Sequence, residues 1–205
     1  MRVPVEPSQW TRIITADPSH TQRYIERFKI MAANGADLDG EARMIDAMVS
    51  RGAHILDAGC GPGRVGGRLH ELGHRVVGVD VDPGLIAAAE VDHPGPRWIA
   101  GDLAELDLAA RGIADKFDAI VCAGNVMGFL APSTRVDVLR GFAAHLAPTG
   151  RAVIGFGAGR GYEFTDFFTD LGAAGLEVQV LLSTWDLRPY ESDSTFLVAV
   201  VGLES

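Results

Sequence analysis

The stretch His54–Leu69, HILDAGCGPGRVGGRL, decides the fold of this chain. An apolar run comes first, and five glycines lie within the sixteen residues. A glycine turn between a buried strand and a helix brings the backbone amides of the helix N-terminus close to a ligand. The same letters also fit the G-x-G-x-x-G pattern of dinucleotide-binding loops. The stretch therefore predicts a strand, a ligand-binding loop and a helix, and it leaves the ligand open.

Strand patterns and helix patterns alternate along the rest of the chain. The expected strands cover residues 54–58, 75–80, 97–102, 117–124, 151–157, 176–187 and 194–203. Strands that alternate with helices predict a mostly parallel sheet covered on both faces, which is a doubly wound α/β fold. No helix pattern separates the last two strands, so we expect them to form an antiparallel C-terminal hairpin at one edge of the sheet.

Two helices are expected before the first strand, over residues 19–35 and 39–52. In the first of them, Tyr24, Phe28 and Met31 recur at helical spacing, and Ser19 is a candidate N-cap. We assign residues 1–52 to an N-terminal helical segment that serves as a lid, and residues 53–205 to a Rossmann-like unit. Both segments are expected to belong to one domain.

Composition and charge restrict the class of protein. Apolar residues make up 47% of the 205 residues, which suits one folded domain. The formal net charge is −9 and no basic run is present, so nucleic acid is not an expected partner. No run of eighteen apolar residues and no signal peptide are found, so we expect a cytoplasmic protein without a membrane partner. We also expect a monomer or a homodimer. Cys60 and Cys122 lack metal-site spacing, so we expect buried thiols and no metal.

Three acidic residues bear on the choice between NAD and an adenosyl ligand. Asp80 ends the second strand, where a carboxylate can accept hydrogen bonds from the ribose hydroxyls of either ligand. Asp57 precedes a G-x-G-x-G at positions 59, 61 and 63, whereas the strand before a dinucleotide loop is apolar. Asp102 and Leu103 follow the third strand and suit the edge and the face of an adenine. The closing hairpin leaves no substrate domain for a nicotinamide reaction, so the sequence favours the adenosyl ligand.

These segments resemble the class I S-adenosylmethionine-dependent methyltransferases. ILDAGCGPG is similar to the glycine motif of that family, and VVGVD is similar to its segment with the ribose-binding acid. IAGDL, FDAIVCAGNVMGFL, LAPTGRAVI and LGAAGLEV follow in the family's order, and the resemblance covers about residues 45–203. It implies a seven-stranded sheet in which strand seven lies antiparallel between strands five and six. It also implies S-adenosyl-L-methionine as the cofactor.

The resemblance implies positions for that cofactor. The loop glycines approach its methionine part, Asp80 binds the ribose, and Asp102 with Leu103 contacts the adenine. Asp57 holds either loop amides or a cofactor amine, and the sequence does not choose between them. The expected cofactor residues are Asp57, Gly59, Gly61, Gly63, Asp80, Val81, Asp102, Leu103, Ala123 and Gly124.

The methyl acceptor is not written in the sequence. A sulfonium methyl is already activated, so its transfer depends on an oriented nucleophile, and no catalytic pair need be present. The loop AGNVMG departs from the Asn/Asp-Pro-Pro-Tyr/Phe motif of relatives that methylate amides and exocyclic amines. We expect a small-molecule acceptor in a mostly apolar pocket. Candidate contacts near the strand ends are Tyr24, Phe28, Asn125, Met127, Phe129, Arg160 and Tyr162.

Two other function classes stay open. A regulatory subunit that binds the cofactor without any activity of its own would carry the same motifs. An NAD(P)-binding oxidoreductase is the weaker alternative, because neither Lys29 nor Lys116 has a tyrosine at the spacing of a catalytic pair.

Overall fold

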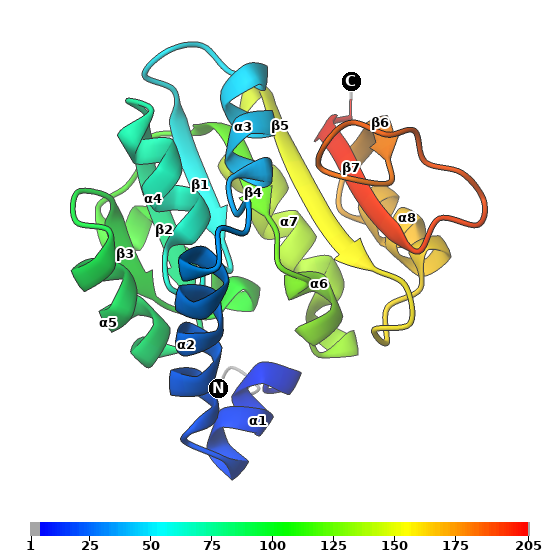
Figure 1. Cartoon of the computed structure of the whole chain (residues 1–205). Coiled ribbons are helices and arrows are strands. Elements are labelled where there is room, and N and C mark those ends of the chain that lie inside the picture. Colours follow the sequence, from blue (N-terminus) through cyan, green and yellow to red (C-terminus); the bar gives the residue numbers. More distant parts are fainter. Residues whose placement is uncertain (1–4, 205) are drawn as a thin grey trace.

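A seven-stranded sheet runs through the computed structural model, which describes residues 5–204 (Figure 1). Its strand order is β3-β2-β1-β4-β5-β7-β6. The first five strands are parallel, and β7 runs antiparallel between β5 and β6, as the family resemblance implied. The strands are β1 (His54–Ala58), β2 (Arg75–Asp80), β3 (Arg97–Ala100), β4 (Phe117–Cys122), β5 (Leu146–Gly157), β6 (Leu176–Leu182) and β7 (Phe196–Leu203).

Helices cover both faces of the sheet, because successive strand residues point to opposite faces and both sets are apolar. Ile55 packs with residues of α3 (Gly40–Met48) and α4 (Arg64–Glu71). Its neighbour Leu56 packs with residues of α7 (Arg135–His145) and α8 (Phe164–Ala173) on the other face. A smaller cluster seats α5 (Pro83–Asp92) on Trp98 of β3. Both faces of the central strands are therefore buried, whereas the edge strand β6 is largely exposed.

Three helix starts show how far local sequence signals reach. Asp82 caps α5 by accepting a hydrogen bond from the amide of Gly84 at 2.8 Å, and Pro83 occupies the first turn. Ser19 precedes α2 (His20–Ala33), but its side chain makes no capping bond and bonds to Asp17 instead. The sequence analysis missed α1 (Gln9–Ala16), whose N-cap Ser8 accepts a bond from the amide of Thr11.

The C-terminal strands differ from the expected boundaries. β5 begins at Leu146, five residues before the expected start, and β6 ends at Leu182 rather than at Leu187. A thirteen-residue segment, 183–195, joins β6 to β7, where a six-residue turn was expected. Trp185 in this segment packs on Gly155 of β5, where a side chain on the glycine would come within 2.4 Å of the ring. That packing explains why the chain leaves the sheet early.

The carboxyl ends of the parallel strands meet at one edge of the sheet. Short helices follow β3 and β4 there: η1 (Leu103–Glu105), η2 (Ala109–Arg111), α6 (Val126–Phe129) and η3 (Pro132–Thr134). Figure 1 shows α1 and α2 near the same edge, in the lower part of the view where β5 ends. No helix within residues 5–204 is long and apolar enough to cross a membrane.

Candidate functional site

The strand order reverses between β1 and β4, and ligands of open α/β sheets bind at such a point beyond the carboxyl ends of the strands. A cavity, here named the first cavity, lies there beneath α1 and α2. Its lining residues come from the N-terminal helices, the glycine loop and the ends of β2, β3 and β4: Ser8, Trp10, Tyr24, Gly59, Gly61, Asp80, Val81, Leu85, Asp102, Leu103, Ala123, Gly124, Val126, Phe129 and Leu130. The point where the strand order reverses therefore contains a cavity.

The loop after β1 folds over the end of β2. The amides of Gly59 and Cys60 both donate to the carbonyl oxygen of Val79, at 2.8 and 3.0 Å. Gly59 has φ +78° and Gly61 has φ +55°, which are conformations that favour glycine. A side chain on Gly59 would also come within 2.3 Å of Val126. The backbone at these two positions therefore depends on the missing side chains.

Asp80 is buried at the end of β2, and two backbone amides hold its carboxylate. The amide of Gly61 donates to Oδ2 and the amide of Asp82 donates to Oδ1, both at 2.9 Å. Burial raises the pKa of Asp80 to about 6, although these two amide bonds lower it. The carboxylate is thus fixed in position while it lines the first cavity.

Asp57 lines a second, adjoining cavity together with the glycine loop. The second cavity is lined by Tyr24, Phe28, Asp57, Gly59, Cys60, Gly61, Pro62, Arg64, Val65, Ala123 and Gly124. Asp57 accepts one hydrogen bond, from the amide of Gly66 at 2.8 Å, and burial raises its pKa to about 7. A carboxyl group that is this buried gains from a cationic ligand, because the ion pair offsets the loss of hydration.

The ends of β3 and β4 complete the first cavity. Asp102 accepts a bond from the amide of Ala104 at 2.9 Å, which starts η1 and buries Leu103. Ala123 and Gly124 continue β4, and Gly124 has φ +69°. These residues combine an acidic group with apolar surface, which suits a planar ring with polar edges.

Aromatic side chains from the N-terminal helices close over these strand ends. Trp10 of α1 packs edge-on against Tyr24 of α2 and Phe129 of α6, with ring centroids 5.0 and 5.5 Å apart. The Tyr24 hydroxyl lies 4.0 Å from the position that a side-chain carbon on Gly124 would occupy. Burial, and then the charge of Asp80, raises the pKa of Tyr24. Tyr24 lines both cavities and so lies at their junction.

Nine of the ten expected cofactor residues line one or both cavities, and the tenth, Gly63, lines neither. A side chain on Gly63 would come within 2.9 Å of Ala89 and 3.1 Å of the Trp98 ring. Gly63 is therefore a packing position against α5 and β3. A side chain on Gly66 would come within 2.9 Å of the same ring, so Gly66 is a packing position as well.

The expected acceptor residues also divide into those that line a cavity and those that do not. Tyr24, Phe28 and Phe129 line the cavities, whereas Asn125, Met127, Arg160 and Tyr162 do not. Met127 and Tyr162 are fully buried in the main core, and the Tyr162 hydroxyl donates to Asp170 at 2.6 Å. Asn125 has φ +65°, and its side-chain oxygen accepts a bond from the amide of Gly157 at 2.8 Å. Arg160 is exposed, and a role of these four residues at the acceptor stays a prediction.

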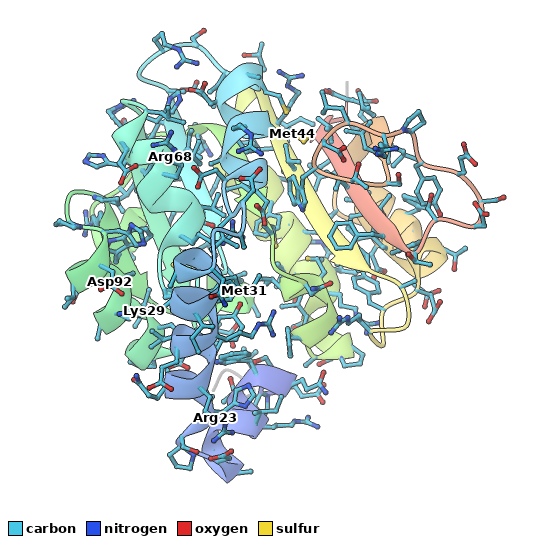
Figure 2. All side chains as sticks on the ribbon, viewed as in Figure 1. Arg23, Lys29, Met31, Met44, Arg68 and Asp92 are labelled. Atoms are coloured by element: carbon cyan, nitrogen blue, oxygen red, sulfur yellow. The ribbon has the colours of Figure 1, made fainter. Side chains whose placement is uncertain are left out.

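Several lining residues were not foreseen, and they come from the start of α1, the glycine loop, α4, α5 and α6. Arg64 forms two hydrogen bonds with Glu41 of α3, at 2.6 and 2.9 Å, and it borders the second cavity. Ser8 could have been found as a helix cap, but the apolar residues Leu85, Val126 and Leu130 carry no distinguishing signal. Figure 2 shows Lys29 and Asp92, whose ion pair at 2.9 Å joins α2 to α5 beside this region.

Comparisons with known proteins agree with this site. A family model described as "Methyltransferase domain" matches residues 55–150, which include the glycine loop, Asp80 and Asp102. A TehB-like SAM-dependent methyltransferase from Corynebacterium glutamicum is 49% identical, with a TM-score of 0.87, and the match covers 92% of this chain and 100% of that one. The chain belongs to the S-adenosylmethionine-dependent methyltransferases. S-adenosyl-L-methionine is accordingly its cofactor.

More distant relatives of this methyltransferase are similar in fold. A methyltransferase from Clostridium acetobutylicum has 14% identity and a TM-score of 0.75, and the match covers 90% of this chain and 99% of that one. A Streptomyces fradiae dTDP-3-amino-3,6-dideoxy-alpha-D-glucopyranose N,N-dimethyltransferase is 30% identical over 125 residues, 58% of this chain and 47% of that protein. The chain spans less than half the length of the curated relatives it matches.

Proposed function

We propose that this methyltransferase transfers the methyl group of S-adenosylmethionine to a small-molecule acceptor. The observation that carries the proposal is the cover that α1 and α2 form over the strand ends. Asp80, Leu103 and Ala123 line the first cavity and are nevertheless at most 8% exposed. A site this covered suits a ligand of a few rings better than a polymer surface.

The residues present fit the cofactor. Asp80 would hold the ribose hydroxyls, with Val81 beside the adenine and Asp102 and Leu103 at its edge and face. Gly59, Gly61, Ala123 and Gly124 would border the methionine part, and the buried Asp57 carboxylate would attract its ammonium group. The lining of both cavities supports this placement, because it combines buried carboxylates with glycines and apolar side chains.

When bound, the cofactor supplies a methyl group that its sulfonium already activates. The work left to the protein is to hold the acceptor in line and to exclude water, and orientation contributes about 7–11 kcal/mol to such steps. Tyr24, Phe28 and Phe129 are the side chains placed to border the acceptor. We assign no general base, since the cavity lining contains no histidine or lysine within the described residues.

The acceptor class rests on charge and on relatives. The net charge of −9 disfavours a nucleic acid substrate, which requires many phosphate contacts. The name of the Streptomyces fradiae relative describes dimethylation of a nucleotide-linked amino sugar, which is a small molecule. Cytoplasmic location and a monomeric or homodimeric state stay predictions from the sequence.

A methyl-transfer screen tests the proposal. The full chain is incubated with methyl-labelled cofactor and with pools of phenols, carboxylic acids and amines, alongside bulk RNA and protein, each with and without a chelator. We expect label in a small-molecule pool, at a rate that the chelator leaves unchanged. Label only in RNA or protein would contradict the acceptor class. Cofactor binding with no transfer to any pool would favour a non-catalytic subunit.

A further inference from the structure

Asp82 touches both N-terminal helices and the end of β2. Its Oδ2 atom accepts hydrogen bonds from Trp10 Nε1 of α1 at 3.1 Å and from Thr21 Oγ1 of α2 at 2.6 Å. Its Oδ1 atom caps α5, and its backbone amide donates to Asp80 at 2.9 Å. Asp82 is 3% exposed, so all four bonds are sheltered from water. One residue thus joins α1, α2 and α5 to the proposed ribose-binding acid.

A second contact, just before α1, is much weaker. Ser133 of η3 donates to Glu6 at 2.6 Å, and Glu6 also pairs with Arg12 of α1. These side chains are exposed, and exposed polar pairs contribute little to stability. The buried bonds at Asp82 are therefore the stronger attachment of α1 and α2 to the sheet.

Both attachments hold α1 beside the first cavity, whose lining includes Ser8 and Trp10. Gly61 and Asp80 line this cavity and are buried beneath α1 and α2, so outward movement of the two helices would widen the access to them. The bonds from Trp10 and Thr21 to Asp82 are the polar contacts that such a movement breaks.

We propose that α1 and α2 form a lid over the cofactor and that Asp82 is its latch, a positioning residue that sets how fast the cofactor exchanges. Closing the lid seats Trp10 over the cavity, and the Asp82 amide then holds Asp80 in the orientation that the ribose requires. Asp82 acts through these groups and does not touch the reacting atoms. The inference rests on the proposed cofactor site, and it is independent of which acceptor is methylated.

Two substitutions remove the latch while they keep the rest of the site. Thr21→Val deletes one hydroxyl at nearly constant shape and leaves the negative charge of Asp82 in place. Asp82→Asn keeps the cap on α5, because asparagine is also a good N-cap, but it points an amide donor at the Trp10 and Thr21 donors. Thr15→Val is the matched control, since Thr15 lies on the same lid and its hydroxyl bonds only to Thr11 within α1.

The experiment measures release of S-adenosylhomocysteine by stopped-flow fluorescence, together with amide hydrogen exchange over residues 9–33 and 83–92. Loss of a bond to a charged acceptor is expected to raise the release rate about tenfold in both latch variants. Exchange should rise in residues 9–33 only, and the double variant should release no faster than Asp82→Asn alone.

Release from Thr21→Val at the rate of Thr15→Val would overturn the latch, as would additive effects in the double variant. If Asp82→Asn unfolds α5, the exchange of residues 83–92 will show it, and Thr21→Val alone then decides. Failure of the wild-type chain to bind S-adenosylhomocysteine would contradict the cofactor site itself, and the latch with it.

Discussion

The half of the sheet formed by β1–β3 and the half that begins at β4 use the polar groups at their carboxyl ends differently. The carboxyl ends of β1 and β2 carry two buried carboxylates, Asp57 and Asp80, which line cavities, and burial raises the pKa of both. After β4 and β5 the polar groups are used within the fold: Asn125 bonds to the Gly157 amide, and Tyr162 bonds to Asp170. One half keeps its polar groups available to a ligand, while the other uses them to fix its own loops.

This difference teaches where specificity resides. The half formed by β1–β3 is shaped for a ligand that every family member shares, so its residues follow a recognisable motif. The half after β4 carries structural side chains at the positions expected to select the acceptor. We therefore expect selection to depend on α1, α2 and α6, which supply Trp10, Tyr24 and Phe129 to the lining of the first cavity.

The largest effect on the ligand-binding half is expected from a substitution of Asp80. Asp80→Ala removes the acceptor of two ribose hydroxyl bonds and of the Gly61 and Asp82 amide bonds, so cofactor affinity should fall about 100-fold or more. Titration calorimetry with S-adenosylhomocysteine measures the loss, and circular dichroism checks the fold. Asp186→Ala, on the exposed segment after β6, is a control that should bind normally. Affinity within threefold of wild type would reduce Asp80 to a structural residue.

A change of pH should affect only the half with the buried carboxylates. Asp57 and Asp80 have pKa values of about 7 and about 6 in the folded chain, above the ordinary 3.8, so folding takes up protons between pH 4 and 7. Their contribution to the free energy of unfolding is full below pH 4 and is lost as the pH rises through 6 and 7. A cationic, hydroxyl-rich ligand prefers the ionised carboxylates, so affinity should have the opposite trend.

We expect affinity for S-adenosylhomocysteine to fall about tenfold or more between pH 8 and pH 5.5, since each group that must ionise costs about tenfold per pH unit below its pKa. Calorimetry in two buffers of different ionisation enthalpy should show proton release near pH 6.5. Asp57→Asn should remove the upper part of the dependence. A flat profile in the wild type would show that the ligand does not sense these charges.

A smaller effect, confined to stability, is expected from Asn125 in the other half. Asn125→Ala leaves the Gly157 amide without its partner and places alanine at φ +65°, so the free energy of unfolding should fall by about 2 kcal/mol. Urea denaturation measures this loss. Asn125→Gly keeps the backbone conformation and should lose only the hydrogen-bond share. A loss of cofactor affinity as large as that of Asp80→Ala would instead place Asn125 in the site.

The smallest effect is expected from Tyr162→Phe. The variant keeps the buried ring and its contact with Arg135 but loses the bond to Asp170, which is worth about 1 kcal/mol. Thermal denaturation should detect this loss. Once an acceptor is identified, the variant should have the same KM for it as the wild type. A changed KM at unchanged stability would return Tyr162 to the acceptor residues.

The sequence predicted the fold where local signals decide it. Strand alternation, the N-cap Asp82 and the acids at the ends of β2 and β3 are all readable without distant contacts. The role of Gly63 could not be distinguished from that of Gly59 and Gly61 in the sequence. Gly63 is required by its close packing against Trp98, a residue of another strand. The burial of Met127 and Tyr162 in the core could not be predicted for a related reason. Whether a side chain beyond a strand turns into the core or into a cavity depends on tertiary packing.

The position of β7 has a consequence for how the chain folds as it is made. Within residues 5–204, β6 shares its ladder with β7 alone, and thirteen residues separate the two strands in the chain. At about 5–20 residues per second this segment takes about a second to make, so β6 is synthesised before its strand partner exists. Strands β1–β5 have all their parallel neighbours once Gly157 is made, so these five strands can pair before β6 and β7 are complete. The last strand then inserts between two waiting edges and closes the sheet.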